Sequence, residues 1–182
     1  MRFLAATLPL SVSLTFDAFD TTLGTLDSVV IKFLGSVTSS VTVNAVTAEP
    51  FGADVSSGAR IRIIGGPGTG TQLTITKSET TAPLSAGTSA VVDFGTLLAD
   101  TTFNAATNLF LSDVTFDLAA VGSNSCGTSG GNNGCDFNTT AGARIEVTYD
   151  YTATPPAKVP EPASMALVGL GMMGLAAIRR RK

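Results

Sequence analysis

The stretch that decides the fold is residues 10–16, LSVSLTF, in which apolar residues alternate strictly with small polar ones. Successive side chains of a β-strand point to opposite faces, so this period of two predicts a strand with one apolar and one polar face. Similar short runs follow at residues 29–34, 37–45, 60–64, 73–76, 90–94, 109–118 and 145–151.

Turn signals separate these runs, notably Leu23-Gly24, Ala86-Gly87 and the segment 65–70, GGPGTG. That glycine-rich segment lacks the Lys-Ser/Thr ending of a phosphate-binding loop and precedes a strand-like run, so it predicts a hairpin turn. Roughly seven to nine short strands with frequent turns predict an all-β fold. We expect an antiparallel β-sandwich of jelly-roll-like architecture over residues 1–152, with strand pairing left open.

Charge is distributed unevenly along the 182 residues. Up to Ala157 the chain carries six basic and thirteen acidic residues, a net charge of −7, whereas the remainder carries +4. The two parts are therefore expected to meet different environments. An acidic body with scattered basic residues has no electrostatic footprint for nucleic acid.

The chain contains no histidine and no tryptophan. Without histidine, the commonest general base and transition-metal ligand is missing, and Ser-His-Asp and Cys-His nucleophile arrangements are excluded. Without tryptophan, a sugar-stacking platform is less well supported. We therefore predict a protein that is not an enzyme, with no catalytic residues, no metal and no cofactor.

Two cysteines, Cys126 and Cys135, flank a loop rich in Gly, Asn and Ser. In an exported protein this pattern favours a disulfide that closes the loop. In the chain-entropy model a loop of about ten residues contributes roughly 3 kcal/mol or less. Free thiols are the alternative, and two cysteines alone supply only half of a zinc ligand set.

Two pairs of aspartates, Asp17 with Asp20 and Asp113 with Asp117, supply oxygen atoms that could hold calcium. Neither pair has the spacing of a calcium loop, and turn-capping or surface positions are the simpler interpretation. Arg60 and Arg62 share one face of a predicted strand, which is expected to be solvated, with pairing to carboxylates as the alternative.

The composition changes after Tyr151. Residues 153–158 include consecutive prolines and predict an extended linker. Residues 159–182 form a separate segment, in which an uncharged run at 163–178 ends at Arg179, Arg180, Arg181 and Lys182. As a helix this run would be about 24 Å long, somewhat short of a bilayer core of about 30 Å. We predict a single C-terminal transmembrane helix whose basic end, 179–182, stays in the cytoplasm, so that the body lies across the membrane.

The motif Pro160-Glu161-Pro162, the apolar run and the basic end occur in the order that resembles a PEP-CTERM sorting signal. This resemblance implies a bacterium with an outer membrane and an extracellular polysaccharide, and processing by an exosortase, a membrane cysteine protease that acts as a transpeptidase. It implies that Pro160, Glu161 and Pro162 are the recognised motif. The apolar run would then stop transiently in the inner membrane.

The segment 16–29, FDAFDTTLGTLDSV, is similar to the choice-of-anchor E domain, which occurs with varied C-terminal anchors. Residues 1–10 carry one positive charge and a short apolar stretch without a small-x-small cleavage site. We therefore expect the true signal peptide to lie upstream of Met1, with a minimal uncleaved signal as the alternative.

Together these features predict an exported, noncatalytic protein of the bacterial surface or extracellular matrix, sorted by an exosortase. Extracellular polysaccharide is the candidate partner at the destination. The alternative is a carbohydrate- or calcium-binding β-sandwich module at the cell surface.

Overall fold

The fold was analysed in a computed structural model, which describes residues 2–7, 10–46, 50–128, 133–155 and 164–179. The chain divides into two compact units, a body of Met1–Thr152 and a tail of Ala153–Lys182. Each unit is described by itself. The division lies next to the boundary at residue 152 that the change in composition predicts.

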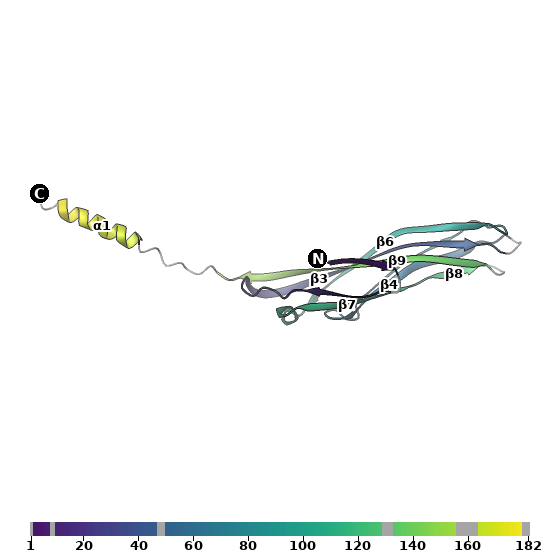
Figure 1. The fold of residues 1–182 in the computed structure, drawn as a ribbon, viewed down its shortest axis with the longest axis horizontal. Helices are drawn as coiled ribbons and strands as arrows, with labels where there is room; N and C mark the ends of the chain where they lie inside the picture. Colours follow the sequence, from purple (N-terminus) through teal and green to yellow (C-terminus); the bar gives the residue numbers. More distant parts are fainter. Residues whose placement is uncertain (1, 8–9, 47–49, 129–132, 156–163, 180–182) are drawn as a thin grey trace. The chain divides into compact units, whose positions relative to one another are not determined.

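The described part of the body consists of strands and one short 3-10 helix (Figure 1). The strands are β1 (Arg2–Thr7), β2 (Leu10–Phe16), β3 (Gly24–Asn44), β4 (Ala53–Gly65), β5 (Gln72–Thr80), β6 (Ser89–Ala105), β7 (Val114–Gly122), β8 (Ser125–Thr128) and β9 (Gly134–Ala153). The 3-10 helix, η1, spans Thr107–Leu111, and the tail holds one helix, α1 (Ser164–Arg179).

The strands form two sheets. One has the order β1-β9-β3-β6, and the other has the order β2-β7-β4-β5 with β8 also paired to β4. The registers resolved between named strands are antiparallel. Buried side chains from both sheets share the core, so the predicted antiparallel β-sandwich is confirmed at the level of two packed antiparallel sheets.

The core has two clusters. The larger contains Phe33, Ile61, Phe116 and Ile145, each at most 1% exposed, and therefore draws on both sheets. The smaller cluster contains Val41, Val43, Ala45, Phe51, Ala53, Val55 and Phe94. The alternation of buried and partly exposed residues along β3 and β4 is the period of two that the sequence predicts.

The predicted strands 29–34 and 37–45 are parts of one strand, β3, which runs through Gly35 and Ser36 without a turn. Gly35 lies where the two sheets approach closely. A Cβ atom at this position would lie 2.9 Å from Cδ1 of Ile61 and 3.0 Å from Cδ1 of Leu73. This glycine provides space for side chains of the opposite sheet.

The prediction of a strand over 109–118 was wrong in its first half. Residues Thr107–Leu111 form η1, and the strand begins at Val114. Phe110 is fully buried, its ring packs against Tyr149, and its carbonyl oxygen accepts a hydrogen bond of 2.8 Å from the backbone N–H of Phe19. Only Phe110 of this apolar run is buried, whereas Leu109 and Leu111 on either side are exposed. The contacts of Phe110 with distant residues therefore determine the local structure, and the apolar pattern does not.

The run at residues 10–16 is the whole of β2, and the runs at 60–64, 73–76, 90–94 and 145–151 are parts of longer strands. Threonine and serine on the outward faces extend these strands without adding apolar residues. A search for apolar alternation therefore underestimates strand length here.

Candidate functional site

Helix α1 is the described part of the predicted sorting segment. It contains no charged residue before Arg179, which lies in the last turn, where a cation is favoured by the helix dipole. Alanine, leucine and methionine favour the helix, whereas Gly169, Gly171 and Gly174 weaken it. The helical prediction for 163–178 is therefore confirmed over its described residues, 164–178.

Five apolar side chains in the middle of α1 are exposed. Those of Leu167, Val168, Leu170, Met172 and Met173 are all more than 60% accessible to solvent. Exposed apolar surface on contiguous residues marks a segment that meets a membrane or another protein. Over the part of the chain that the structure describes, no helix combines the length and hydropathy required to cross a membrane.

The predicted recognition residues Pro160, Glu161 and Pro162 lie outside the described residues. The same holds for Arg180, Arg181 and Lys182 of the basic end, and for Ala163. Within the predicted extended linker 153–158, residues 153–155 are described: Ala153 ends β9, and residues 154 and 155 form no helix or strand.

The predicted disulfide is present between Cys126 on β8 and Cys135 on β9, with Cα atoms 6.4 Å apart. Because β8 pairs with β4 and β9 pairs with β3, the bond joins the two sheets. Both cysteines pack against the smaller core cluster. The disulfide therefore stabilises this end of the sandwich as well as closing the loop between the cysteines.

The predicted aspartate pairs do not come together as cation ligands. Asp113 accepts a hydrogen bond from the backbone N–H of Ala18, and Asp117 accepts one from the hydroxyl of Ser13. Asp20 accepts hydrogen bonds from the hydroxyl and the backbone N–H of Thr22, and these bonds lower the pKa of Asp20. Three of the four carboxylates thus bind groups of the chain itself, in keeping with the turn-capping and surface interpretation.

Within the described ranges no group of three or more Asp, Glu or Cys residues is arranged to hold a metal ion. The glycine-rich segment 65–70 is a hairpin turn, as predicted, and joins β4 to β5. Gly66, Gly68 and Gly70 adopt positive φ angles of 86°, 75° and 97° there, and the N–H of Gly70 donates to the carbonyl of Ile63 at 2.9 Å.

An aromatic cluster at one end of the body was missed in the sequence. The ring of Phe19 packs against Tyr149 and Tyr151, with ring centroids 5.5 and 5.4 Å away. Burial raises the pKa of the Tyr149 hydroxyl, and the negative charge of Asp17 raises it further. The period-two spacing of the two tyrosines on β9 was the only local signal of this cluster, since Phe19 lies outside any predicted strand.

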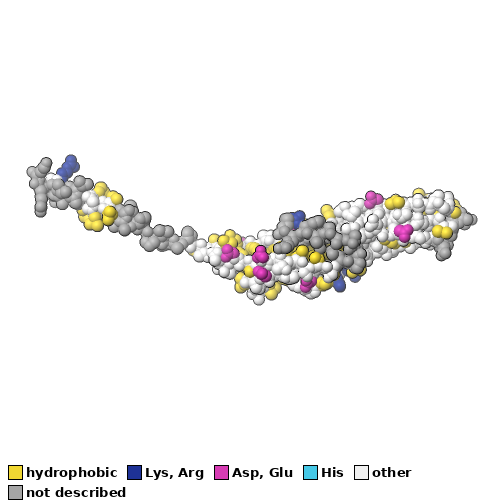
Figure 2. Space-filling view, viewed as in Figure 1, with side chains coloured by type: hydrophobic (Ala, Val, Ile, Leu, Met, Phe, Trp, Pro, Cys, Tyr) yellow, Lys and Arg dark blue, Asp and Glu magenta, His cyan; other side chains and the backbone are white. Residues whose placement is uncertain are grey.

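Two polar pockets lie on the outer faces of the sheets. One, of about 350 Å³, is lined mainly by hydroxyl, amide and carboxylate side chains of β3, β6 and β9, including Ser40, Asp93, Asn138 and Thr140. The other, of about 260 Å³, is lined by Arg60, Arg62, Val121, Gly122 and Ser123. On the face shown in Figure 2, charged side chains of the body are few and scattered among polar and apolar ones.

In chain order, the described residues form an antiparallel β-sandwich and then a helix with exposed apolar side chains. Residues 158–182 match the PEP-CTERM protein-sorting motif, which marks an exported protein that an exosortase sorts to the cell envelope or surface. The motif covers the tail and leaves the body unassigned.

No curated protein matches the chain. Among solved structures, the chain is similar to a protein in the structure of infectious bursal disease virus Gt strain, with 17% identity over 95% of this chain and 49% of that chain and a TM-score of 0.26. For the Gx strain the identity is 17% over 78% of this chain and 32% of that chain, with a TM-score of 0.23. The chain thus spans about half or less of the length of these viral proteins.

Proposed function

We propose that the protein is a noncatalytic component of the bacterial surface or extracellular matrix, delivered there by exosortase processing of its tail. The observation that carries the proposal is the sorting motif at 158–182, which contains helix α1, a helix without charge before its last residue, Arg179. The body supplies a stable, disulfide-linked scaffold, and its low content of charged groups suits an exported β-protein.

In this proposal α1 stops in the inner membrane only temporarily. A helix of 16 residues is about 24 Å long, so it spans a core of about 30 Å only with thinning of the bilayer. Arg179 and the three basic residues after it hold the end of the chain on the cytoplasmic side. The exosortase then recognises Pro160, Glu161 and Pro162, whose prolines favour an extended backbone. The host is a Gram-negative bacterium.

For the body we propose the jelly-roll form of the sandwich. The chain passes from one sheet to the other between β2 and β3, β3 and β4, β5 and β6, and β6 and β7, which supports this assignment. The similarity of residues 16–29 to the choice-of-anchor E domain belongs to the same proposal. Extracellular polysaccharide is the proposed partner of the delivered protein.

A Glu161→Ala variant expressed in the native host tests the sorting step. We expect full-length variant protein to accumulate in the inner membrane, because the recognised carboxylate is missing, while the parent chain reaches the outer fractions. Glu79→Ala is the matched control, since Glu79 is a partly exposed residue of β5 far from the tail in sequence. Normal sorting of Glu161→Ala would contradict the proposal, as would equal retention of both variants.

The second candidate function is carbohydrate binding at the surface, and the polar pocket lined by Ser40, Asp93, Asn138 and Thr140 favours it. Sugar hydroxyls require such a mixture of donors and acceptors. A glycan array probed with the parent chain and with an Asp93→Ala/Asn138→Ala variant separates the two candidates. Binding that depends on these residues supports the module, and no binding leaves the structural role.

A further inference from the structure

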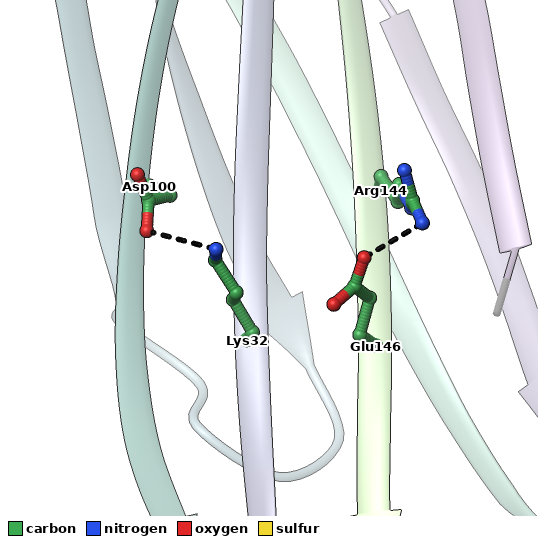
Figure 3. A network of polar contacts seen from close by, with 4 residues as sticks. All are labelled: Lys32, Asp100, Arg144 and Glu146. Carbon is green, nitrogen blue, oxygen red and sulfur yellow. Dashed lines mark ion pairs between the residues drawn. The ribbon is translucent and has the colours of Figure 1, made fainter.

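The basic residues of the body differ in whether they have carboxylate partners. Three of them form ion pairs: Lys32 with Asp100 at 3.5 Å, Lys77 with Glu79 at 2.6 Å and Arg144 with Glu146 at 2.7 Å. Figure 3 shows two of these pairs, one between neighbouring strands and one along β9. By contrast, Arg60 and Arg62 form neither an ion pair nor a side-chain hydrogen bond within the described part of the chain.

These two arginines lie together on the outward face of β4. Residues two apart on a strand point to the same side and are about 7 Å apart. Across the sheet, Arg60 lies opposite Thr74 and Val121, and Arg62 lies opposite Gln72 and Ala119. All four of these neighbours are uncharged, so no directly opposite side chain compensates the two positive charges.

The backbone around the arginines is held firmly. β4 pairs with β5 on one side and with β7 on the other, and both arginines belong to the paired registers. The pocket that they line, of about 260 Å³, is completed by Val121, Gly122 and Ser123. The backbone N–H of Ser123 donates to the carbonyl of Gly58 at 3.0 Å, which links Ser123 to β4. The hydroxyl of Ser123 forms no hydrogen bond with another described residue.

Guanidinium groups bind planar anions through two parallel N–H donors, and a carboxylate matches this geometry. We propose that the pocket formed by Arg60, Arg62 and Ser123 binds a carboxylate group of an acidic polysaccharide. The arginines donate to the carboxylate, and the hydroxyl of Ser123 donates to the same group or to a neighbouring oxygen of the sugar. The spacing of about 7 Å also lets each arginine hold a separate carboxylate of a polymer.

The charge of the rest of the body sets how this site behaves. The body has a net negative charge, which repels a polyanion overall, whereas the two arginines attract it locally. Asp117, an acidic residue on the outward face of β7, accepts a hydrogen bond from the hydroxyl of Ser13 and lies two residues from Ala119, the cross-strand partner of Arg62. The proposed binding is electrostatic, so it weakens as salt screens the interaction. This inference deepens the proposed function by naming the polymer class, and it concerns the body rather than the tail.

The test measures binding of polygalacturonate oligomers, a polymer of carboxylate-bearing sugars, to the full chain in nonionic detergent by isothermal titration calorimetry. An Arg60→Gln/Arg62→Gln variant is compared with Lys32→Gln/Lys77→Gln, which removes the same charge from two lysines that already have partners. We expect the arginine variant to bind about tenfold more weakly or worse, and the lysine variant to stay within about twofold of the parent. Circular dichroism verifies that both variants are folded.

Two further probes identify the source of the anion. Neutral dextran is expected not to bind, and dextran sulfate is expected to bind more weakly than polygalacturonate. Equal losses in the two variants, unchanged binding by the arginine variant, or no binding by the parent would each overturn the proposal. Preference for dextran sulfate would overturn the assignment to a carboxylate. These outcomes do not depend on tail processing, so a failure here is distinguishable from a failure of the sorting proposal.

Discussion

The body and the described part of the tail differ in the burial of their apolar residues. In the body, alternate residues such as Phe33 and Phe116 are fully buried between the sheets, whereas Leu167, Val168 and Met172 of α1 are largely exposed. Burial of apolar area is the main source of folding free energy, so the body is stable through its own core. The tail has no such core among its described residues.

The largest expected effect of a single change in the body comes from Phe116→Ala. Phe116 is fully buried in the larger core cluster, so its truncation leaves a cavity and should lower the free energy of unfolding by about 3–5 kcal/mol. Chemical denaturation followed by circular dichroism measures the loss. Met172→Ala in α1 is the control and should leave body stability unchanged, because Met172 is exposed. A similar loss of unfolding free energy in both variants would contradict the difference in burial between the two regions.

Removal of the disulfide should have the next largest effect. A Cys126→Ser/Cys135→Ser variant loses the covalent bond between β8 and β9 and should be roughly 2–3 kcal/mol less stable. Denaturation of the parent with and without reductant gives the same comparison without mutation. Reductant should have no effect on the double variant. If the parent were equally stable with and without reductant, the disulfide would not contribute to the stability of the sandwich.

Gly58→Ala tests the close approach of β4 and β5. A Cβ atom at this position would lie 1.9 Å from the carbonyl oxygen of Ile75, so the paired strands must separate locally. We expect a loss of about 1–3 kcal/mol in the free energy of unfolding. Gly134→Ala is the matched control, because no atom lies within 4 Å of the added Cβ atom. A stable Gly58→Ala variant would show that this pairing is looser than described.

The smallest effect is a pH dependence of the body. Because the pKa of Tyr149 is raised in the folded state, folding favours its protonated form. This contribution to stability is fully present below the ordinary tyrosine pKa of about 10 and is lost as the pH rises through the folded-state value. Thermal unfolding between pH 8 and 11 should show a steeper decline for the parent than for Tyr149→Phe. Parallel declines would contradict the assignment.

The strand pattern of the body could be predicted because one side of each sheet is buried. The alternation at residues 29–33 and 60–64 reflects that burial directly. The continuity of β3 through Gly35 could not be predicted, since the need for a small residue there arises from Ile61 and Leu73 on the other sheet. The 3-10 turn at Phe110 was hidden for the same reason, because its contacts with Phe19 and Tyr149 are distant in sequence.

The sites divide in a similar way. The disulfide and the sorting segment could be predicted because their signals are local: cysteines flanking a short loop, and a motif followed by an apolar run and cations. The pocket at Arg60 and Arg62 could not, because it depends on the uncharged neighbours that β5 and β7 place beside β4. The two arginines alone indicated a solvated face or pairing with carboxylates, not a pocket.

Mass spectrometry of the mature C-terminus tests the central claim most directly. The protein is isolated from the surface of native cells and from cells that lack the exosortase. We predict that residues of α1 and the basic end are absent from the mature protein in the first strain, and that the intact tail ending at Lys182 is retained in the second. An intact tail on protein at the surface of both strains would contradict this prediction.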